Sequence, residues 1–173
     1  TMQRAIFTGD YKNYFTCDVR SMDKLAVIKY CELNGTILWT KEIPLKSNEN
    51  TVEAGIIQGN IYVYCNEEIQ IINPADGSVI NNVVLTGNYT MLADDNDTML
   101  FYDYNGLESD GTPGIATVIA ADTNGSILWK NEIKGCPEFY YFKESDGIKT
   151  LIIQSDCNTF KSFDRNTGVV KGE

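Results

Sequence analysis

A short segment is repeated four times along this chain, and the repetition limits the folds open to it. Each copy is a turn that ends in glycine, followed by residues typical of β-strands; the copies occupy residues 33–39, 74–80, 123–129 and 166–170. Their glycines are residues 35, 77, 125 and 168, so successive copies lie 42, 48 and 43 residues apart. Such a period is typical of repeat proteins, in which each repeat buries its apolar face only against its neighbours. The sequence therefore predicts four similar structural repeats.

Each copy predicts a β-hairpin. Asn-Gly or Asp-Gly between two β-rich segments favours a two-residue type I′ turn, in which both central residues have positive φ. Three copies contain such a pair, and the fourth contains Thr167-Gly168. The second copy lies in the most regular pattern, with expected strands at residues 52–58, 61–65, 68–73 and 78–85.

Four strands in each period, with no helical periodicity, predict an all-β chain. The expected fold is a β-propeller of about four blades, each made of four antiparallel strands. With 173 residues and 43% hydrophobic side chains, the chain can bury the core of a single domain. We expect this domain to span residues 1–173, with approximate blades at 1–45, 46–87, 88–134 and 135–173.

The cysteines and the apolar segments bear on the cellular compartment. The 5 cysteines are odd in number, and their spacing matches no set of metal ligands. Secreted domains normally pair their cysteines, so we expect free thiols in the reducing cytoplasm; the alternative is a periplasmic or secreted protein with disulfides. No apolar segment approaches the roughly 20 residues of a membrane-spanning helix, and we find no signal segment, so no membrane association is expected.

The repeat also resembles that of a known family. Residues 32–39 and 122–129 each contain an acidic residue, a short turn ending in glycine, and a strand with tryptophan. This pattern is similar to the repeat of pyrroloquinoline-quinone-type (quinoprotein-like) β-propellers, over nearly the whole chain. The resemblance implies that tryptophans interlock the blades. Trp39 and Trp129 are present here, whereas Ile80 and Val170 stand near the equivalent place in the other two copies.

This chain differs from that family in the number of its repeats and in the residues that would bind the quinone. Its propellers commonly have more than four blades, which leaves three alternatives: a closed four-blade monomer, a fragment, or half of an eight-blade ring completed in a homodimer. The residues that hold the quinone and its metal in that family cannot be matched in this sequence. We therefore expect a non-enzymatic relative with no cofactor.

The absence of histidine restricts the chemistry further, because the sequence contains 0 His. Ser-His-Asp and Cys-His catalysis are excluded, and so are most zinc sites. Asp94, Asp95 and Asp97 crowd oxygen ligands of the kind that Ca²⁺ prefers. Asp and Asn are also the usual residues of turns, and the spacing is not that of a calcium loop. The interpretation adopted is a turn without a metal ion, in a chain that is not an enzyme.

The net charge of −10 indicates what the chain could bind. Nucleic acids are bound through cationic patches, so direct binding of nucleic acid is not expected. An acidic surface favours a basic protein partner, although it also serves solubility.

Aromatic and acidic side chains gather around the longest step of the repeat. Tyr102 and Tyr104 lie on one face of an expected strand, and Glu108 and Asp110 follow in the insertion 105–114. Insertions in repeat arrays form loops on one face, often the binding face. We predict these four residues as protein contacts; the alternative is that the tyrosines pack between neighbouring blades.

Three hypotheses for the function follow. The first is a non-catalytic, protein-binding β-propeller, in its most specific form an acidic inhibitor or immunity-type protein that covers the basic active site of a toxin or nuclease. The second is an exported scaffold or assembly protein of the cell envelope. The third is a hydrolase or lyase acting on carbohydrates with carboxylates alone.

Overall fold

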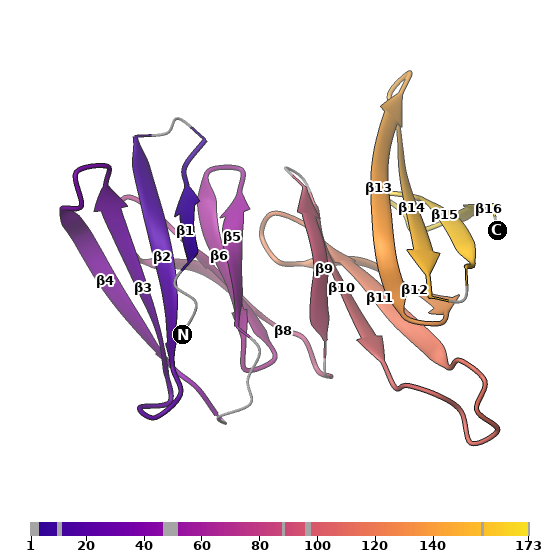
Figure 1. Ribbon diagram of the computed structural model, residues 1–173. Coiled ribbons are helices and arrows are strands. Elements are labelled where there is room, and N and C mark those ends of the chain that lie inside the picture. The colour runs from indigo at the N-terminus through magenta and orange to yellow at the C-terminus, as the bar shows by residue number, and fades with distance from the viewer. Residues whose placement is uncertain are drawn as a thin grey trace. The chain divides into compact units, whose positions relative to one another are not determined.

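The computed structural model consists of strands and connecting turns, with no helix in the residues that it describes. These residues are 4–9, 12–46, 52–87, 89–95, 98–156 and 158–172; for residues 93–95 only the backbone is described. The strands form four sheets, each four-stranded and antiparallel (Figure 1).

In each sheet the strands follow one another in chain order, so every connection inside a sheet is a hairpin. The first sheet contains β1 (Arg4–Phe7), β2 (Asn13–Arg20), β3 (Leu25–Glu32) and β4 (Ile37–Pro44). The second contains β5 (Glu53–Ile57), β6 (Asn60–Cys65), β7 (Glu68–Ile72) and β8 (Val79–Val84). The third contains β9 (Thr90–Asp95), β10 (Thr98–Tyr104), β11 (Ile115–Ala121) and β12 (Ile127–Lys134). The fourth contains β13 (Pro137–Ser145), β14 (Ile148–Ser155), β15 (Phe160–Asp164) and β16 (Val170–Gly172).

This arrangement confirms the predicted all-β chain of four antiparallel, four-stranded sheets. The sequence predicts all four strands of the second sheet, whereas in each other sheet it predicts bounds for three strands only, those that correspond to β2–β4, β10–β12 and β13–β15. The structure adds β1, β9 and β16, which stand at an edge of their sheets and each pair with a single neighbour. An edge strand pairs with one neighbour and not with two. Its sequence therefore shows the alternation of apolar and polar residues less clearly.

The prediction of two-residue type I′ turns was wrong. In the turn between β3 and β4, Glu32 N–H donates to the Thr36 carbonyl and Gly35 N–H donates to the Glu32 carbonyl, both at 2.9 Å. In each repeat the glycine is the turn residue with positive φ, from 70° at Gly168 to 90° at Gly35. These loops have three residues in the first and third repeats and four residues in the second and fourth, and each ends in one left-handed glycine. A single glycine therefore suffices, which explains why Thr167 can replace Asn or Asp.

In the third and fourth sheets an aspartate at the end of the third strand, or directly after it, holds the turn that follows. The Asp122 Oδ1 atom accepts hydrogen bonds from Asn124 N–H at 2.8 Å and Ser126 N–H at 2.9 Å. The Asp164 Oδ1 atom accepts from Thr167 N–H at 3.1 Å and from its hydroxyl at 3.0 Å. Side chains of this kind satisfy backbone donors that the sheet leaves unpaired. The acidic residue of the repeat thus has a structural role.

Acid should remove a specific contribution of Asp164 to stability. Lys171 Nζ lies 3.0 Å from Asp164 Oδ2, and this contact, followed by hydrogen bonds from Thr167, lowers the pKa of Asp164 from 3.8 to about 2. A carboxyl group with a depressed pKa stabilises the fold above its unfolded pKa, and the contribution is lost as pH falls through the folded value. We expect Asp164→Asn to be less stable than the wild type above about pH 4, with the difference vanishing towards about pH 2.

Urea unfolding of the two proteins at several pH values measures that difference. In the background of Lys171→Met, the stability difference should change over a narrower range of pH. This substitution removes the largest cause of the lowered pKa of Asp164. A difference between wild type and Asp164→Asn that does not change with pH would contradict the assignment.

The chain divides into two compact units, Thr1–Thr86 and Gly87–Glu173. Each unit pairs two sheets around one apolar cluster. In the first unit the cluster joins residues of the first and second sheets: Phe15, Ala26, Ile28, Tyr30, Ile43, Leu45, Ile61, Val63, Cys65 and Ile72. In the second unit it joins the third and fourth sheets: Leu100, Ala116, Val118, Ala120, Trp129, Ile133, Leu151, Ile153 and Phe163. Sheets packed face to face in this way bury apolar side chains between them.

A tryptophan connects the two sheets inside each unit. Trp39 on β4 donates from Nε1 to the Pro74 carbonyl at 2.8 Å. Trp129 on β12 donates from Nε1 to the Arg165 carbonyl at 2.7 Å. Each ring also covers the turn glycine of the next repeat, Gly77 or Gly168. The tryptophans therefore interlock consecutive sheets in both units.

Other residues stand in the place of tryptophan in the second and fourth repeats. In the first sheet, Cys31 on β3 pairs with Ile37 on β4, and Tyr30 pairs with Trp39. The β4 strand therefore has a bulge between these two pairs. By the same register, Asn81 holds this position in β8, opposite Ile71, and Gly172 holds it in β16, opposite Ser162. Ile80 and Val170 thus lie near this position, one residue before Asn81 and two residues before Gly172.

Candidate functional site

The insertion 105–114 is an ordered extension of the hairpin formed by β10 and β11. Leu107 forms an isolated antiparallel bridge with Pro113. Inside it, Glu108 N–H donates to the Thr112 carbonyl at 2.8 Å, and Gly114 N–H donates to the Gly106 carbonyl at 3.0 Å. These hydrogen bonds fix the backbone of the loop. Leu107 nevertheless remains 68% exposed, which is unusual for a large apolar side chain in an ordered loop.

Asp110 stabilises the tip of this loop. Its Oδ1 atom accepts hydrogen bonds from Thr112 N–H at 2.9 Å and from the Thr112 hydroxyl at 2.7 Å. The hydroxyl and backbone hydrogen bonds of Thr112, with a smaller contribution from the charge of Lys134, lower the pKa of Asp110. The loop therefore carries a fixed negative charge at neutral pH.

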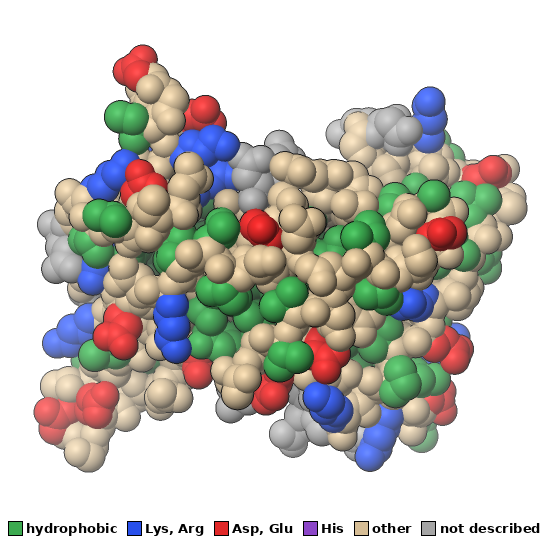
Figure 2. Space-filling view, turned by 180° about the vertical axis from the view of Figure 1, so that it is seen from behind, with side chains coloured by type: hydrophobic (Ala, Val, Ile, Leu, Met, Phe, Trp, Pro, Cys, Tyr) green, Lys and Arg blue, Asp and Glu red, His purple; other side chains and the backbone are tan. Residues whose placement is uncertain are grey.

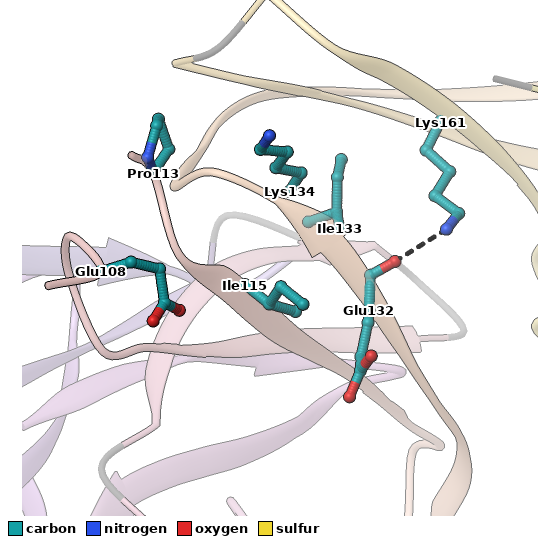
Figure 3. Close-up of a pocket in the computed structure, with 7 residues that line it drawn as sticks. All are labelled: Glu108, Pro113, Ile115, Glu132, Ile133, Lys134 and Lys161. Atoms are coloured by element: carbon teal, nitrogen blue, oxygen red, sulfur yellow. Dashed lines mark hydrogen bonds between the residues drawn. The ribbon is translucent and has the colours of Figure 1, made fainter. Parts of the chain in front are cut away.

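A pocket of about 420 Å³ lies beside the loop, in the second unit (Figure 3). Its apolar lining comes from Pro113, Ile115 and Ile133, and its charged lining from two glutamates and two lysines: Glu108, Glu132, Lys134 and Lys161. Lys161, on β15, donates from Nζ to the backbone carbonyl of Glu132 at 3.0 Å. The pocket is thus built by the third and fourth sheets together.

The structure separates the four predicted contact residues into two groups. Glu108 lines the pocket and Asp110 lies nearby on the exposed loop. Tyr102 and Tyr104 are half-buried and pack against the apolar cluster of the second unit. Burial, followed by the charge of Cys136 and a side-chain hydrogen bond to it, raises the pKa of Tyr102. This placement of Tyr102 and Tyr104 agrees with the alternative prediction, in which the tyrosines pack between neighbouring blades.

Several pocket residues were not singled out from the sequence. Glu132 and Lys134 are two residues apart on β12, so their side chains leave the strand on the same face, and this alternation was a usable signal. Lys161 lies in the following repeat and reaches the pocket only through the packing of the two sheets. Ile115 is 53% exposed although it begins a strand.

The candidate calcium ligands fall largely outside the described part of the structure. Asp94 and Asp95 are in the backbone of β9, but their side chains and all of Asp97 are among the residues not described. Among the described residues, no three Cys, Asp or Glu side chains are grouped as metal ligands. The described residues likewise contain no helix long and apolar enough to cross a membrane.

The cysteines that the structure describes, Cys17, Cys31, Cys65 and Cys136, are free. Burial is the largest cause that raises the pKa of Cys17 and of Cys65, each to about 11. Both thiols are therefore protonated near neutral pH and are poor nucleophiles.

Charged side chains of both signs share the face of the molecule shown in Figure 2. Figure 2 shows acidic and basic side chains interspersed with apolar ones on the face that it presents. The net charge of −10 is therefore not concentrated on this face. A local combination of charge and apolar surface, such as the loop and its pocket, is the better guide to a binding site.

Comparison with known proteins identifies the fold. No protein-family model matches the chain, and no curated protein matches it. Among solved structures, BamB from Moraxella catarrhalis is similar with a TM-score of 0.51 and 14% identity, over 96% of this chain and 62% of that chain. The WD40 domain of SCAP from fission yeast is similar with a TM-score of 0.54 and 10% identity, over 98% of this chain and 43% of that chain.

The chain thus spans less than two thirds of the length of either of these structures. At such low identity the likeness concerns the fold alone. Together with the four hairpin-connected sheets, it shows that this chain has the repeat fold of β-propeller proteins.

Proposed function

We propose that this chain is a non-catalytic module that binds another protein, and that the partner is basic. The observation that carries the proposal is the ordered, acidic loop 105–114, which presents the exposed Leu107 beside Glu108 and Asp110. A loop fixed by its own hydrogen bonds loses little conformational entropy when a partner docks, so more of the contact energy appears as affinity. Exposed apolar surface with a charged rim is typical of protein interfaces.

The most specific form of the proposal is an inhibitor that covers the basic active site of a toxin or nuclease. The net charge of −10 favours such a partner. The protonated, buried thiols of Cys17 and Cys65 and the absence of histidine from the sequence support a role without catalysis. The free thiols of the described cysteines support a reducing compartment such as the cytoplasm.

Neutralising the loop should weaken binding to a basic partner. The double variant Glu108→Gln/Asp110→Asn removes both charges and keeps an oxygen acceptor for Thr112, so the loop conformation should be preserved. Exposed charges at the rim of an interface act mainly on the association rate and its salt dependence. We expect a loss of affinity of roughly threefold to tenfold.

Affinity capture from a lysate of the source cells tests this expectation, with wild type and variant immobilised side by side. The matched control is Glu144→Gln/Asp146→Asn, which makes the same charge change on the hairpin between β13 and β14. Wild type and control should retain a basic protein in stoichiometric amount, and the loop variant should retain less. A chain that forms a dimer by light scattering and retains no basic protein would contradict the proposal.

A further inference from the structure

We infer that the pocket beside the loop 105–114 binds an arginine side chain of the partner; this inference rests on the function proposed above. The pocket combines an apolar lining with two carboxylates, which is the combination that an arginine requires. Its aliphatic stem is apolar, and its guanidinium binds carboxylates through paired hydrogen bonds.

Part of the apolar lining is accessible to a ligand, although Ile133 is only 2% exposed. Ile115 is 53% exposed at the start of β11, and Pro113 and Ile133 complete the apolar part of the pocket. A volume of about 420 Å³ is within the range of sites that enclose small molecules. One long side chain can therefore enter and cover Ile115.

Two carboxylates flank the exposed apolar side chain of the pocket. In Figure 3 the Ile115 side chain lies between the carboxylates of Glu108 and Glu132. Within the described part of the chain, no ion pair involves either carboxylate. Two carboxylates that form no such ion pair, beside an exposed apolar residue, favour a cation with an apolar stem.

The two lysines of the pocket do not reverse this preference. The Nζ atom of Lys161 donates to the Glu132 carbonyl at 3.0 Å. In Figure 3, Lys134 points away from the two carboxylates, and its charge acts on Asp110, whose pKa it helps to lower. The lysines thus already interact with groups of this chain, and the carboxylates of Glu108 and Glu132 remain for a ligand.

Arginine suits the pocket better than lysine. Its guanidinium is planar, presents five donors, and is more weakly hydrated than an ammonium group, so it is the usual cation at partly buried interface sites. Its guanidinium can form paired hydrogen bonds with a carboxylate, whereas an ammonium group acts as a compact point charge.

The test uses the whole chain and a defined probe. The peptide acetyl-Gly-Arg-Gly-amide is titrated to millimolar concentration while the methyl signals of Ile115 and Ile133 are followed by NMR. The matched probe contains citrulline, which has the shape of arginine without its charge. We expect saturable shifts of both isoleucines with the arginine peptide and none of comparable size with the citrulline peptide.

Variants of the chain assign the effect to the carboxylates. Glu132→Gln and Glu108→Gln should each weaken binding of the arginine peptide by about tenfold, since each removes a charged hydrogen-bond acceptor. Glu144→Gln on β13 is the control and should leave binding unchanged. Equal shifts with both peptides, or shifts that persist in both pocket variants, would overturn the inference.

The inference and the proposed function fail in different ways. If wild type and Glu132→Gln retain a basic protein equally well, and the arginine peptide causes no shift, the inference of an arginine-binding pocket is contradicted. The proposed protein-binding function would still stand. Loss of capture in the loop variant together with loss in Glu132→Gln would support both. Retention of no basic protein by the wild type would remove the proposed function, whatever the peptide does.

Discussion

Replacing Trp129 by alanine is expected to lower the free energy of unfolding of the second unit by about 3–5 kcal/mol. The side chain is only 7% exposed, and its ring stacks on Phe163 with the centroids 5.6 Å apart. Its Nε1 atom also donates to the Arg165 carbonyl at 2.7 Å. The substitution removes apolar contact between the third and fourth sheets and the hydrogen bond that joins them.

Urea unfolding followed by circular dichroism measures this loss. Trp39 is then the remaining tryptophan of the 2 in the sequence, so its fluorescence reports on the first unit alone and should change little. Trp129→Phe keeps an aromatic ring and loses the hydrogen bond, so we expect a smaller loss of about 1–3 kcal/mol. Equal losses for phenylalanine and alanine would contradict the assignment of most of the energy to ring packing.

Gly168→Ala is expected to be nearly as damaging, although it adds only a methyl group. Gly168 has a φ of 70°, in the left-handed region, and an added Cβ would lie 2.6 Å from Cγ of Trp129. The left-handed conformation costs an alanine about 1–2 kcal/mol. Displacing a packed ring costs about 1–3 kcal/mol more. Both costs fall on the contact that joins the two sheets of the second unit.

Gly35→Ala is the matched control for this substitution. Gly35 has a φ of 90°, and a Cβ there would have nothing within 4 Å. It should therefore cost only the conformational part, about 1–2 kcal/mol. The remaining part at Gly168 should disappear in the background of Trp129→Ala, which a double-mutant cycle measures as coupling. Equal costs for the two glycine substitutions would show that the tryptophan contact is unimportant.

Much of the fold could be predicted from local sequence because the signals are local. Short apolar, β-rich segments such as 61–65 are bounded by turn residues, and glycine at 35, 77, 125 and 168 marks each hairpin. The length of the loop in each hairpin could not be predicted from these local signals. Asn-Gly is compatible with both a two-residue and a three-residue loop, and the bulge in each outer strand decides between them.

The candidate site was predicted only in part. The insertion 105–114 was visible as the excess length of one repeat, and Glu108 was among the residues proposed from it. For Tyr102 and Tyr104 the sequence left two alternatives, protein contact or packing between blades, because an aromatic residue in alternation looks the same whether it faces solvent or a neighbouring sheet. The pocket also depends on Lys161, which belongs to another sheet.

The sequence by itself determined the repeat, the four sheets and the acidic character of the chain, because turn chemistry and alternation act between residues that are close along the chain. Only the tertiary structure decided the partners of Trp39 and Trp129, the burial of the tyrosines, and the pocket formed by Glu108, Glu132 and Ile115. These features depend on side chains that pack across two sheets. No local pattern encodes such contacts, because each sheet meets its neighbour through residues roughly one period away in sequence.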